Sequence, residues 1–334
     1  MKNSGIGGQA VMEGIMMRNG SRYAVAVRKA DGSIVCDRRE YHSITEKSRI
    51  LRLPLIRGVF AMIDSLVLGM KSLEWSSEQV MDDGEDAAEE EPSRFEQWLD
   101  RKFGEKAEKV IMGGTMAVAV VLAVLIFSVM PTVIAGWLGS WIRSSVLLAF
   151  LEGVIRVAIF IAYISLISLT KDIRRTYMYH GAEHKCINCV EHGLPLNVEN
   201  VLKSSKEHKR CGTSFMLFVM LISILLFMVV RPQGMGLRIL SRILLIPVVA
   251  GISYEFLRLA GNSDGKIINA LSRPGLWLQG LTTREPDAAM AEVAIRAVEE
   301  VFDWKAYLRE NFPAGDPDEN QKEHTAGGAK AAAD

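Results

Sequence analysis

Residues 111–142 read IMGGTMAVAVVLAVLIFSVMPTVIAGWLGSWI and contain no charged side chain. A helix of about 20 apolar residues is long enough to cross the hydrocarbon core of a bilayer, which is about 30 Å thick. The stretch exceeds this length, so it predicts a membrane-spanning helix over about residues 112–138. We therefore expect an integral membrane protein.

Three further apolar stretches predict that the chain crosses the membrane again, at about 146–170, 212–230 and 237–257. The first contains Glu152 and Arg156, which are one helical turn apart and are expected to pair inside the helix bundle. The last contains Arg238 and Arg242 near its start, and their long side chains are expected to reach the membrane surface. The fold class is therefore mainly α, with about four transmembrane helices in a domain over 111–258.

The distribution of basic residues predicts the orientation of these spans. Basic side chains precede the first span, at Arg101, Lys102, Lys106 and Lys109, and they are frequent in the loop 171–210 and after the fourth span. The positive-inside rule then places both termini and this loop in the cytoplasm. The opposing signal is the group of arginines near the predicted outer turn, at Arg231, Arg238 and Arg242.

Composition agrees with a multi-pass membrane protein. The 39 basic and 39 acidic residues cancel, which gives no indication of nucleic-acid binding. The mean hydropathy is +0.16. The start of the chain lacks the pattern of a cleavable signal peptide. The expected partners are the lipid bilayer and either another membrane protein or a second copy of the chain.

The parts outside the spans are expected to form small elements. Residues 1–50 combine a glycine-rich segment with a β-hairpin, because alternating residues on both sides of Asp31-Gly32 indicate two strands. The other segments are an interfacial amphipathic helix over 51–75, an acidic flexible linker over 76–100, a cytoplasmic segment over 259–311 with a helix at 287–311, and a disordered tail over 312–334.

The sequence HGAEHK at 180–185 carries the most specific chemistry. On a helix, His180 and His184 share one face and can present two imidazoles to one metal ion. The pattern His-x-x-Glu-His also matches the inverzincin motif, in which the histidines bind zinc and the glutamate is the general base. Glu183 is therefore the candidate catalytic residue, and zinc or another divalent metal is the candidate cofactor.

Two histidines do not complete a zinc site, because such sites take three or four protein ligands. His208 and Cys211 are three residues apart, and one helical turn would direct both side chains towards the same ion. The other candidates are Cys186, Cys189, Glu191, His192 and, from the fourth span, Glu255. The alternative is a polar network at the membrane surface in which the histidines only bond backbone carbonyls.

Several spaced motifs resemble those of the YqhQ-like bacterial membrane family. They are GGQAVMEGIMMR at 7–18, HGAEHK at 180–185, RCGTS at 210–214, PGLWLQ at 274–279 and TTREP at 282–286. The resemblance extends over about residues 5–303 and covers motifs in the same order. It implies a multi-span protein of the bacterial plasma membrane with unknown function, sometimes described as a predicted metal-dependent enzyme, and it implies no substrate.

The sequence is compatible with two functions. The first is a non-catalytic membrane platform or biogenesis partner whose cytoplasm-facing cluster binds metal or stiffens the loop. The second is a zinc-dependent membrane hydrolase that acts on a lipid head group or a membrane-proximal peptide. We favour the platform because Gly181 is expected to weaken the helix around the motif, and Gly193 and Pro195 to end it soon after.

Overall fold

The computed structural model describes residues 2–81, 104, 107–261 and 265–313. The chain forms two compact units, of which the first comprises Met1–Asp83, Ile164–Phe218 and Ala250–Asp334 and the second Gly84–Tyr163 and Val219–Val249. Nearly all of the predicted acidic linker, from residue 82 onward, and of the predicted tail lies outside the described residues.

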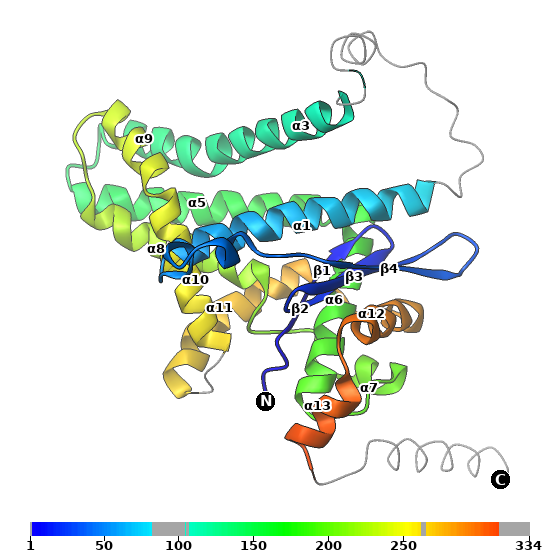
Figure 1. The fold of residues 1–334 in the computed structure, drawn as a ribbon. Coiled ribbons are helices and arrows are strands. Elements are labelled where there is room, and N and C mark those ends of the chain that lie inside the picture. Colours follow the sequence, from blue (N-terminus) through cyan, green and yellow to red (C-terminus); the bar gives the residue numbers. More distant parts are fainter. Residues whose placement is uncertain (1, 82–103, 105–106, 262–264, 314–334) are drawn as a thin grey trace, which may run out of the picture. The chain divides into compact units, whose positions relative to one another are not determined.

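The first unit contains a four-stranded antiparallel sheet in the order β1-β2-β3-β4 (Figure 1). The strands are β1 (Ile6–Val11), β2 (Gly14–Asn19), β3 (Arg22–Arg28) and β4 (Ile34–Glu40). Strands β3 and β4 form the hairpin that the sequence predicted. The glycine-rich segment adds two further strands, with Val11 opposite Gly14 across a tight turn.

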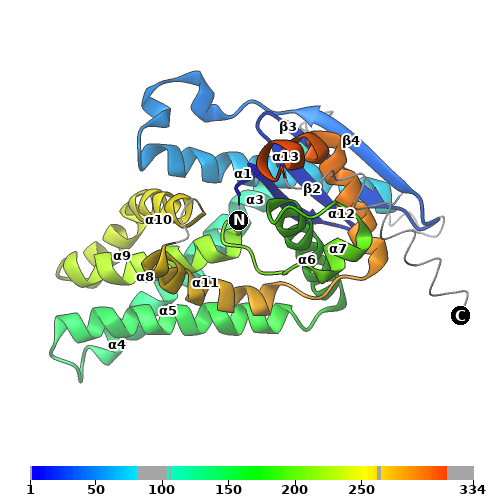
Figure 2. The same cartoon turned by 90° about the horizontal axis from the view of Figure 1, so that it is seen from below.

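Alternation along the strands gives the sheet two apolar faces. On one face Ile15, Met17 and the small Ala24 pack against α6 (Lys171–Glu191) and α12 (Ala288–Val301). These helices lie against the strands in both views (Figures 1 and 2). On the other face Val25 and Val27 pack with Leu68 of α1 (Ile56–Met81). The site described below therefore rests on a sheet that is covered on both faces.

Two short 3-10 helices, η1 (Ile44–Lys47) and η2 (Ile50–Arg52), lead into α1 (Ile56–Met81). This helix begins and ends about five residues later than the interfacial helix predicted from the sequence. Leu68 is buried, whereas Leu66 and Leu73 are each 47% exposed. The helix thus packs on the sheet through one face and leaves apolar residues uncovered on another.

Three described helices are long and apolar enough to cross a membrane. The first, Gly113–Leu138, is a continuous helix made of α3 (Ala107–Val124), the π-helical turn η4 (Leu125–Val129) and α4 (Met130–Leu138). The others are α5 (Ser145–Ile167) and α8 (Gly212–Val229). In the most apolar 18-residue segment of each helix, only 11% to 33% is buried inside the protein. Most of the apolar surface of these described helices therefore has no protein partner.

The fourth predicted span is a bent pair of helices. Helices α9 (Met235–Leu244) and α10 (Ile246–Gly261) meet at an angle of 41°. Arg242 does not extend to the surface as the sequence suggested, because its side chain is 2% exposed and bonds Glu152 at 2.9 Å. The predicted Glu152–Arg156 pair is present at 3.5 Å, so the carboxylate is shared by two arginines.

The part of the chain after α10 forms more helix than the sequence indicated. Helix α11 (Lys266–Thr282), which the sequence analysis did not predict, includes Pro274. The helix predicted over 287–311 is divided into α12 and α13 (Trp304–Asn311), because Phe302 and Asp303 leave the helical conformation. The loop predicted over 171–210 is largely helical, with α6 followed by α7 (Val198–Lys203).

Candidate metal centre

Helix α6 presents both histidines of the HGAEHK motif on one face. It runs without a break for 21 residues and ends at Glu191, just before the glycine and proline that the sequence identified as stop signals. His180 and His184 are one turn apart, and their ring centroids are 4.4 Å from each other. Gly181 therefore does not interrupt the helix, and the motif lies inside a regular helix.

Each histidine bonds a backbone carbonyl through Nδ1. His180 Nδ1 lies 2.9 Å from the Thr282 oxygen, and His184 Nδ1 lies 2.6 Å from the Lys206 oxygen. A carbonyl only accepts hydrogen bonds, so Nδ1 of each ring carries the hydrogen. Nε2 of each ring is then the atom available to a ligand, and a backbone carbonyl on Nδ1 is the usual support of a metal-binding histidine.

The carbonyl that supports His184 is itself held by α6. The Asn188 amide donates to the Ser205 and Glu207 oxygens at 2.7 and 2.9 Å. One turn earlier, Lys185 Nζ donates to the Leu202 and Ser204 oxygens, both at 2.8 Å. These bonds fix the segment 202–207 along the helix and direct the Lys206 carbonyl towards His184.

The carbonyl that supports His180 depends on a close approach at Gly181. A Cβ atom at this position would lie 2.0 Å from the Arg284 oxygen. The Arg284 amide also donates to the Tyr177 oxygen at 2.9 Å. Only glycine lets the backbone approach α6 so closely, and this approach brings the Thr282 oxygen to His180.

Cys211 supplies the third ligand atom. Its Sγ lies 3.2 Å from His180 Nε2 at the start of α8. Ligand atoms of His180, His184 and Cys211 all lie within 4.8 Å of one another. Two imidazoles and a thiolate suit zinc, so three of the four predicted metal ligands converge on one point.

The electrostatics of the three groups favour an ionised sulfur. Burial on its own raises the pKa of Cys211, but the charges and hydrogen bonds of His180 and His184 outweigh burial and hold this pKa well below its usual value. Burial lowers the pKa of His180, and the Cys211 thiolate raises it to about 9. A thiolate is the form of cysteine that binds metal ions.

Glu183 lies beside this group and is 5% exposed. Its carboxylate receives a hydrogen bond from the Gly8 amide, and its Oε2 has no hydrogen-bond partner among the described residues. Burial raises the pKa of Glu183, although the two neighbouring histidines lower it. A buried carboxylate with a free oxygen and a raised pKa has the properties of a general base.

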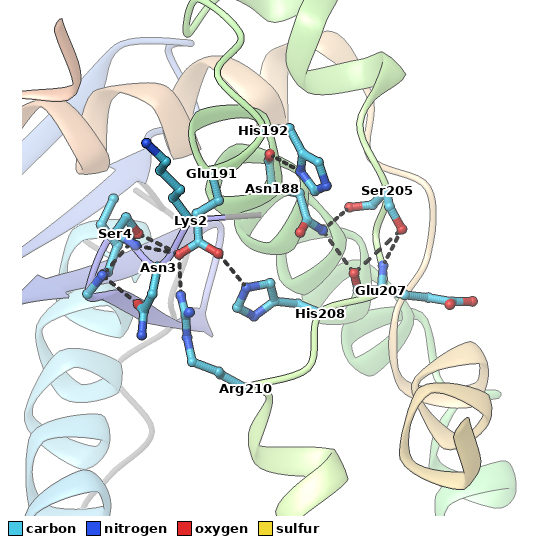
Figure 3. A network of polar contacts seen from close by, with 12 residues as sticks. Lys2, Asn3, Ser4, Asn188, Glu191, His192, Ser205, Glu207, His208 and Arg210 are labelled. Carbon is cyan, nitrogen blue, oxygen red and sulfur yellow. Dashed lines mark hydrogen bonds and ion pairs between the residues drawn. The ribbon is translucent and has the colours of Figure 1, made fainter. Parts of the chain in front are cut away.

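His208, the fourth predicted ligand, bonds a different group. Its Nε2 lies 3.5 Å from Glu191 Oε2, and Glu191 also accepts from Arg210 and from the Ser4 amide and hydroxyl (Figure 3). The His208 ring centroid is 5.7 Å from that of His184. His208 therefore lies next to the three-ligand group but is turned towards Glu191.

The other candidate ligands lie in other environments. The Cys186 side chain is part of the apolar core, and Cys189 Sγ lies 3.5 Å from the Pro195 oxygen. His192 bonds the Asn188 oxygen at 2.7 Å. Glu255 forms an ion pair with Arg57 at the start of α1. None of these belongs to the group of three.

Two residues of the site were not identified from the sequence as parts of it. Gln279 is fully buried, and its amide bonds both the amide and the carbonyl of His208 at 2.9 and 2.7 Å. Gly8 approaches Glu183, since a Cβ atom there would lie 2.9 Å from Glu183 Cγ. Both residues lie in motifs that carry the family resemblance, and this position is the sequence feature that could have indicated a role in the site.

A cavity of about 480 Å³ opens beside the site. His180, Glu183 and Cys211 line it together with the cationic side chains of Arg18 and Arg210. Arg210 Nη1 is buried and has no hydrogen-bond partner among the described residues. The cavity thus joins two of the three ligands, His180 and Cys211, with the carboxylate and one unsatisfied donor.

Comparison with known proteins identifies relatives without assigning an activity. A family described as "Protein of unknown function (DUF1385)" matches residues 53–304. The chain is 35% identical over 310 residues to "Uncharacterized protein YqhQ" of Bacillus subtilis (strain 168), and the match covers 91% of this chain and 94% of that protein. No solved structure matches the chain.

Proposed function

We propose that the chain, which belongs to the DUF1385 family of proteins of unknown function, is a multi-pass membrane protein with a zinc-dependent hydrolytic site. The observation that carries the proposal is the convergence of His180, His184 and Cys211 beside Glu183, whose Oε2 has no partner among the described residues. Three protein ligands with a fourth position left to water are the arrangement of catalytic zinc sites.

A zinc ion held by these ligands would lower the pKa of a bound water to about 7. The protein's own contribution is the orientation of the two imidazoles by the Thr282 and Lys206 carbonyls, together with a carboxylate that accepts a proton. Arg18 and Arg210 supply positive charge at the wall of the cavity, which favours a substrate whose transition state gains negative charge on oxygen.

The preference for a non-catalytic platform rested on a weak helix around Gly181 and on its early end at Gly193 and Pro195, and the second of these expectations holds, because α6 ends at Glu191. Helix α6 is nevertheless continuous through the motif, so Gly181 does not interrupt the helical context that a catalytic motif needs. A site with only a structural role is expected to fill all four positions with protein ligands, whereas His208 is turned to Glu191. The geometry therefore supports the hydrolase better than the platform.

Membrane insertion belongs to the same proposal. The three apolar helices keep most of their side chains outside the protein interior, and Val118 is 59% and Leu225 65% exposed. Apolar surface of this extent is stable when it faces lipid. The basic residues around the spans favour a cytoplasmic position for both termini and for the metal site.

Metal analysis of the full-length protein in detergent tests the site. We expect about one zinc per chain in the wild type and in Glu183→Gln, and none in His184→Ala. His42→Ala is the matched control, because His42 is exposed and lies outside the site. Zinc absent from the wild type after reconstitution, or retained by His184→Ala, contradicts the proposed metal centre.

Hydrolysis of 4-nitrophenyl acetate tests catalysis separately from binding. If Glu183 is the general base, Glu183→Gln keeps its zinc and loses about 10²- to 10⁴-fold in rate. Equal rates for the wild type and Glu183→Gln at equal zinc content would exclude this role and leave the platform with a structural metal.

A further inference from the structure

The second unit contains a cavity that the proposed function does not use. It has a volume of about 530 Å³ and lies between the first turns of α5, the end of α8 and the start of α9. The residues that define its chemistry are Arg231, Arg238, Arg242, Glu152 and Ser145. The three arginines are also the residues that opposed the predicted membrane orientation.

The charge around this cavity is strongly positive. Arg242 bonds Glu152 at 2.9 and 3.2 Å, and Arg156 bonds the same carboxylate at 3.5 Å. Both arginines and the glutamate are at most 5% exposed. Glu152 is the only acidic residue among the described residues that line the cavity, so one carboxylate is shared by two buried guanidinium groups.

The remaining charge at the cavity is not balanced by Glu152. Arg231 bonds only a neutral group among the contacts described, the Ser145 hydroxyl at 3.0 Å, and Arg238 is half-buried in the wall. Arg231 is exposed and Arg238 is partly exposed, and two guanidinium groups with no carboxylate partner among the described residues give the cavity a positive potential that attracts anions. The cavity therefore favours an anion.

Backbone groups at the start of α9 add to this preference. The residue before the helix is Gly234, and no side chain caps the first turn. The free amides of a first turn, together with the helix dipole, attract anions. Gly234 and Gln233 line the cavity, so the amides and the arginines act on the same space.

We propose that this cavity binds a phosphate group. Guanidinium groups form paired hydrogen bonds with phosphate oxygens. Leu148 and Val229 line the same cavity, and their apolar side chains offer a surface that an acyl chain attached to the phosphate can contact. The phosphate belongs either to a lipid head group or to a soluble anion, and the two sources are separated by the experiment.

Calorimetric titration of the full-length protein in dodecyl maltoside tests the site. The two probes are inorganic phosphate and dihexanoyl phosphatidylglycerol. Binding of the lipid alone identifies a head-group site, and binding of phosphate alone identifies a site for a soluble anion. Absence of binding by both probes overturns the proposal.

Substitutions at the cavity assign any binding to it. Arg231→Gln and Arg238→Gln are each expected to weaken binding by about tenfold to a hundredfold, because each removes a charge-assisted hydrogen bond. Arg143→Gln is the matched control, since Arg143 is exposed in the same unit and does not line the cavity. Unchanged affinity in both cavity variants overturns the proposal.

Two further variants keep the test decisive. Arg238→Lys keeps the charge without the paired donors and is expected to bind with intermediate affinity, so it replaces Arg238→Gln if that variant does not fold. His184→Ala is expected to bind phosphate normally, which separates this site from the metal centre.

Discussion

Glu183 is positioned by a glycine that is distant in sequence. Gly8 lies in β1, and a Cβ atom on it would lie 2.8 Å from the Met16 oxygen and 2.9 Å from Glu183 Cγ. A side chain at residue 8 would have to move Glu183 or the neighbouring strand. The glycine-rich motif is therefore a strand whose missing side chain makes room for the carboxylate.

The Gly8→Ala substitution tests this role. We expect it to lower the free energy of unfolding by about 1–3 kcal/mol, as overpacking does, and to reduce hydrolysis with the zinc retained. Gly7→Ala is the matched control, because nothing lies within 4 Å of a Cβ atom at residue 7. Thermal unfolding of both variants measures the effect, and equal losses of stability would contradict it.

Glu191 is expected to make folding sensitive to acid. Burial raises its pKa, but the His208 hydrogen bond and the Arg210 charge outweigh burial and lower the pKa to about 2, from the usual 4.5. A carboxylate with a lowered pKa stabilises the fold fully above its unfolded pKa and loses this contribution as the pH falls through the folded pKa. The affected window is therefore about pH 4.5 to 2.

Comparison of two variants isolates this contribution. Glu191→Gln is expected to be less stable at pH 7, because Arg210 loses its partner, and to show a smaller loss of stability between pH 4.5 and 2 than the wild type. Glu310→Gln serves as control, since Glu310 is exposed at the end of α13. An acid response of Glu191→Gln equal to that of the wild type excludes Glu191 as its source.

At the level of single elements, the prediction for α6 was correct for the positions of the two histidines and misleading for the effect of Gly181. The spacing of His180 and His184 correctly placed them on one helix face. The helix propensity of Gly181 misled the prediction, because propensity ignores the tertiary contact in which the Arg284 carbonyl approaches this residue. A local scale cannot detect a partner that is 103 residues away.

The same limit explains the other differences. Strands β1 and β2 were not predicted, because the Gly7-Gly8 pair is unusual in a strand and a turn at Glu13 separates the two strands. Helix α11 was not predicted, because proline, here Pro274, is unfavourable inside a helix. Arg242 was expected to extend to the surface, but Glu152 of another helix pairs with it. His208 was assigned to the metal because it lies three residues from Cys211, and spacing alone did not show that Glu191 pairs with it.

The Gly181→Ala substitution tests the contact between α6 and residues 282–284. The added methyl group is expected to displace the Thr282 carbonyl from His180 and to weaken zinc binding by about 10- to 100-fold, as loss of such a supporting bond does. Gly280→Ala in α11 is the control, because nothing lies within 4 Å of a Cβ atom there. It is expected to stabilise the helix by up to about 1 kcal/mol.

Competition of zinc with a chromogenic chelator measures the affinities of both variants. Equal zinc affinity of Gly181→Ala and the wild type would mean that the Thr282 carbonyl does not support His180. A loss of affinity in Gly280→Ala would mean that zinc binding responds to any change in this region.

For the whole molecule, the number of membrane crossings depends on the bent pair α9 and α10. The three continuous helices alone would leave the two ends of the chain on opposite sides of the membrane. If the bent pair crosses as one span, both ends lie on the same side. Among the four candidate spans, this segment differs from the others by its bend of 41° and by the buried Arg242.

Fusions of reporter proteins determine which alternative is correct. We expect green fluorescent protein attached after Asp334 to fluoresce, because the positive-inside rule places the C-terminus in the cytoplasm. Alkaline phosphatase attached after Gln233, in the turn before α9, is expected to be active because this enzyme folds only outside the cytoplasm. Activity of alkaline phosphatase at Asp334 instead would mean that α9 and α10 do not cross, and would place residues 265–313 on the opposite side from the N-terminus. Since β2 and β3 in the N-terminal sheet pack against α12, that outcome is incompatible with the first unit, and we expect four crossings.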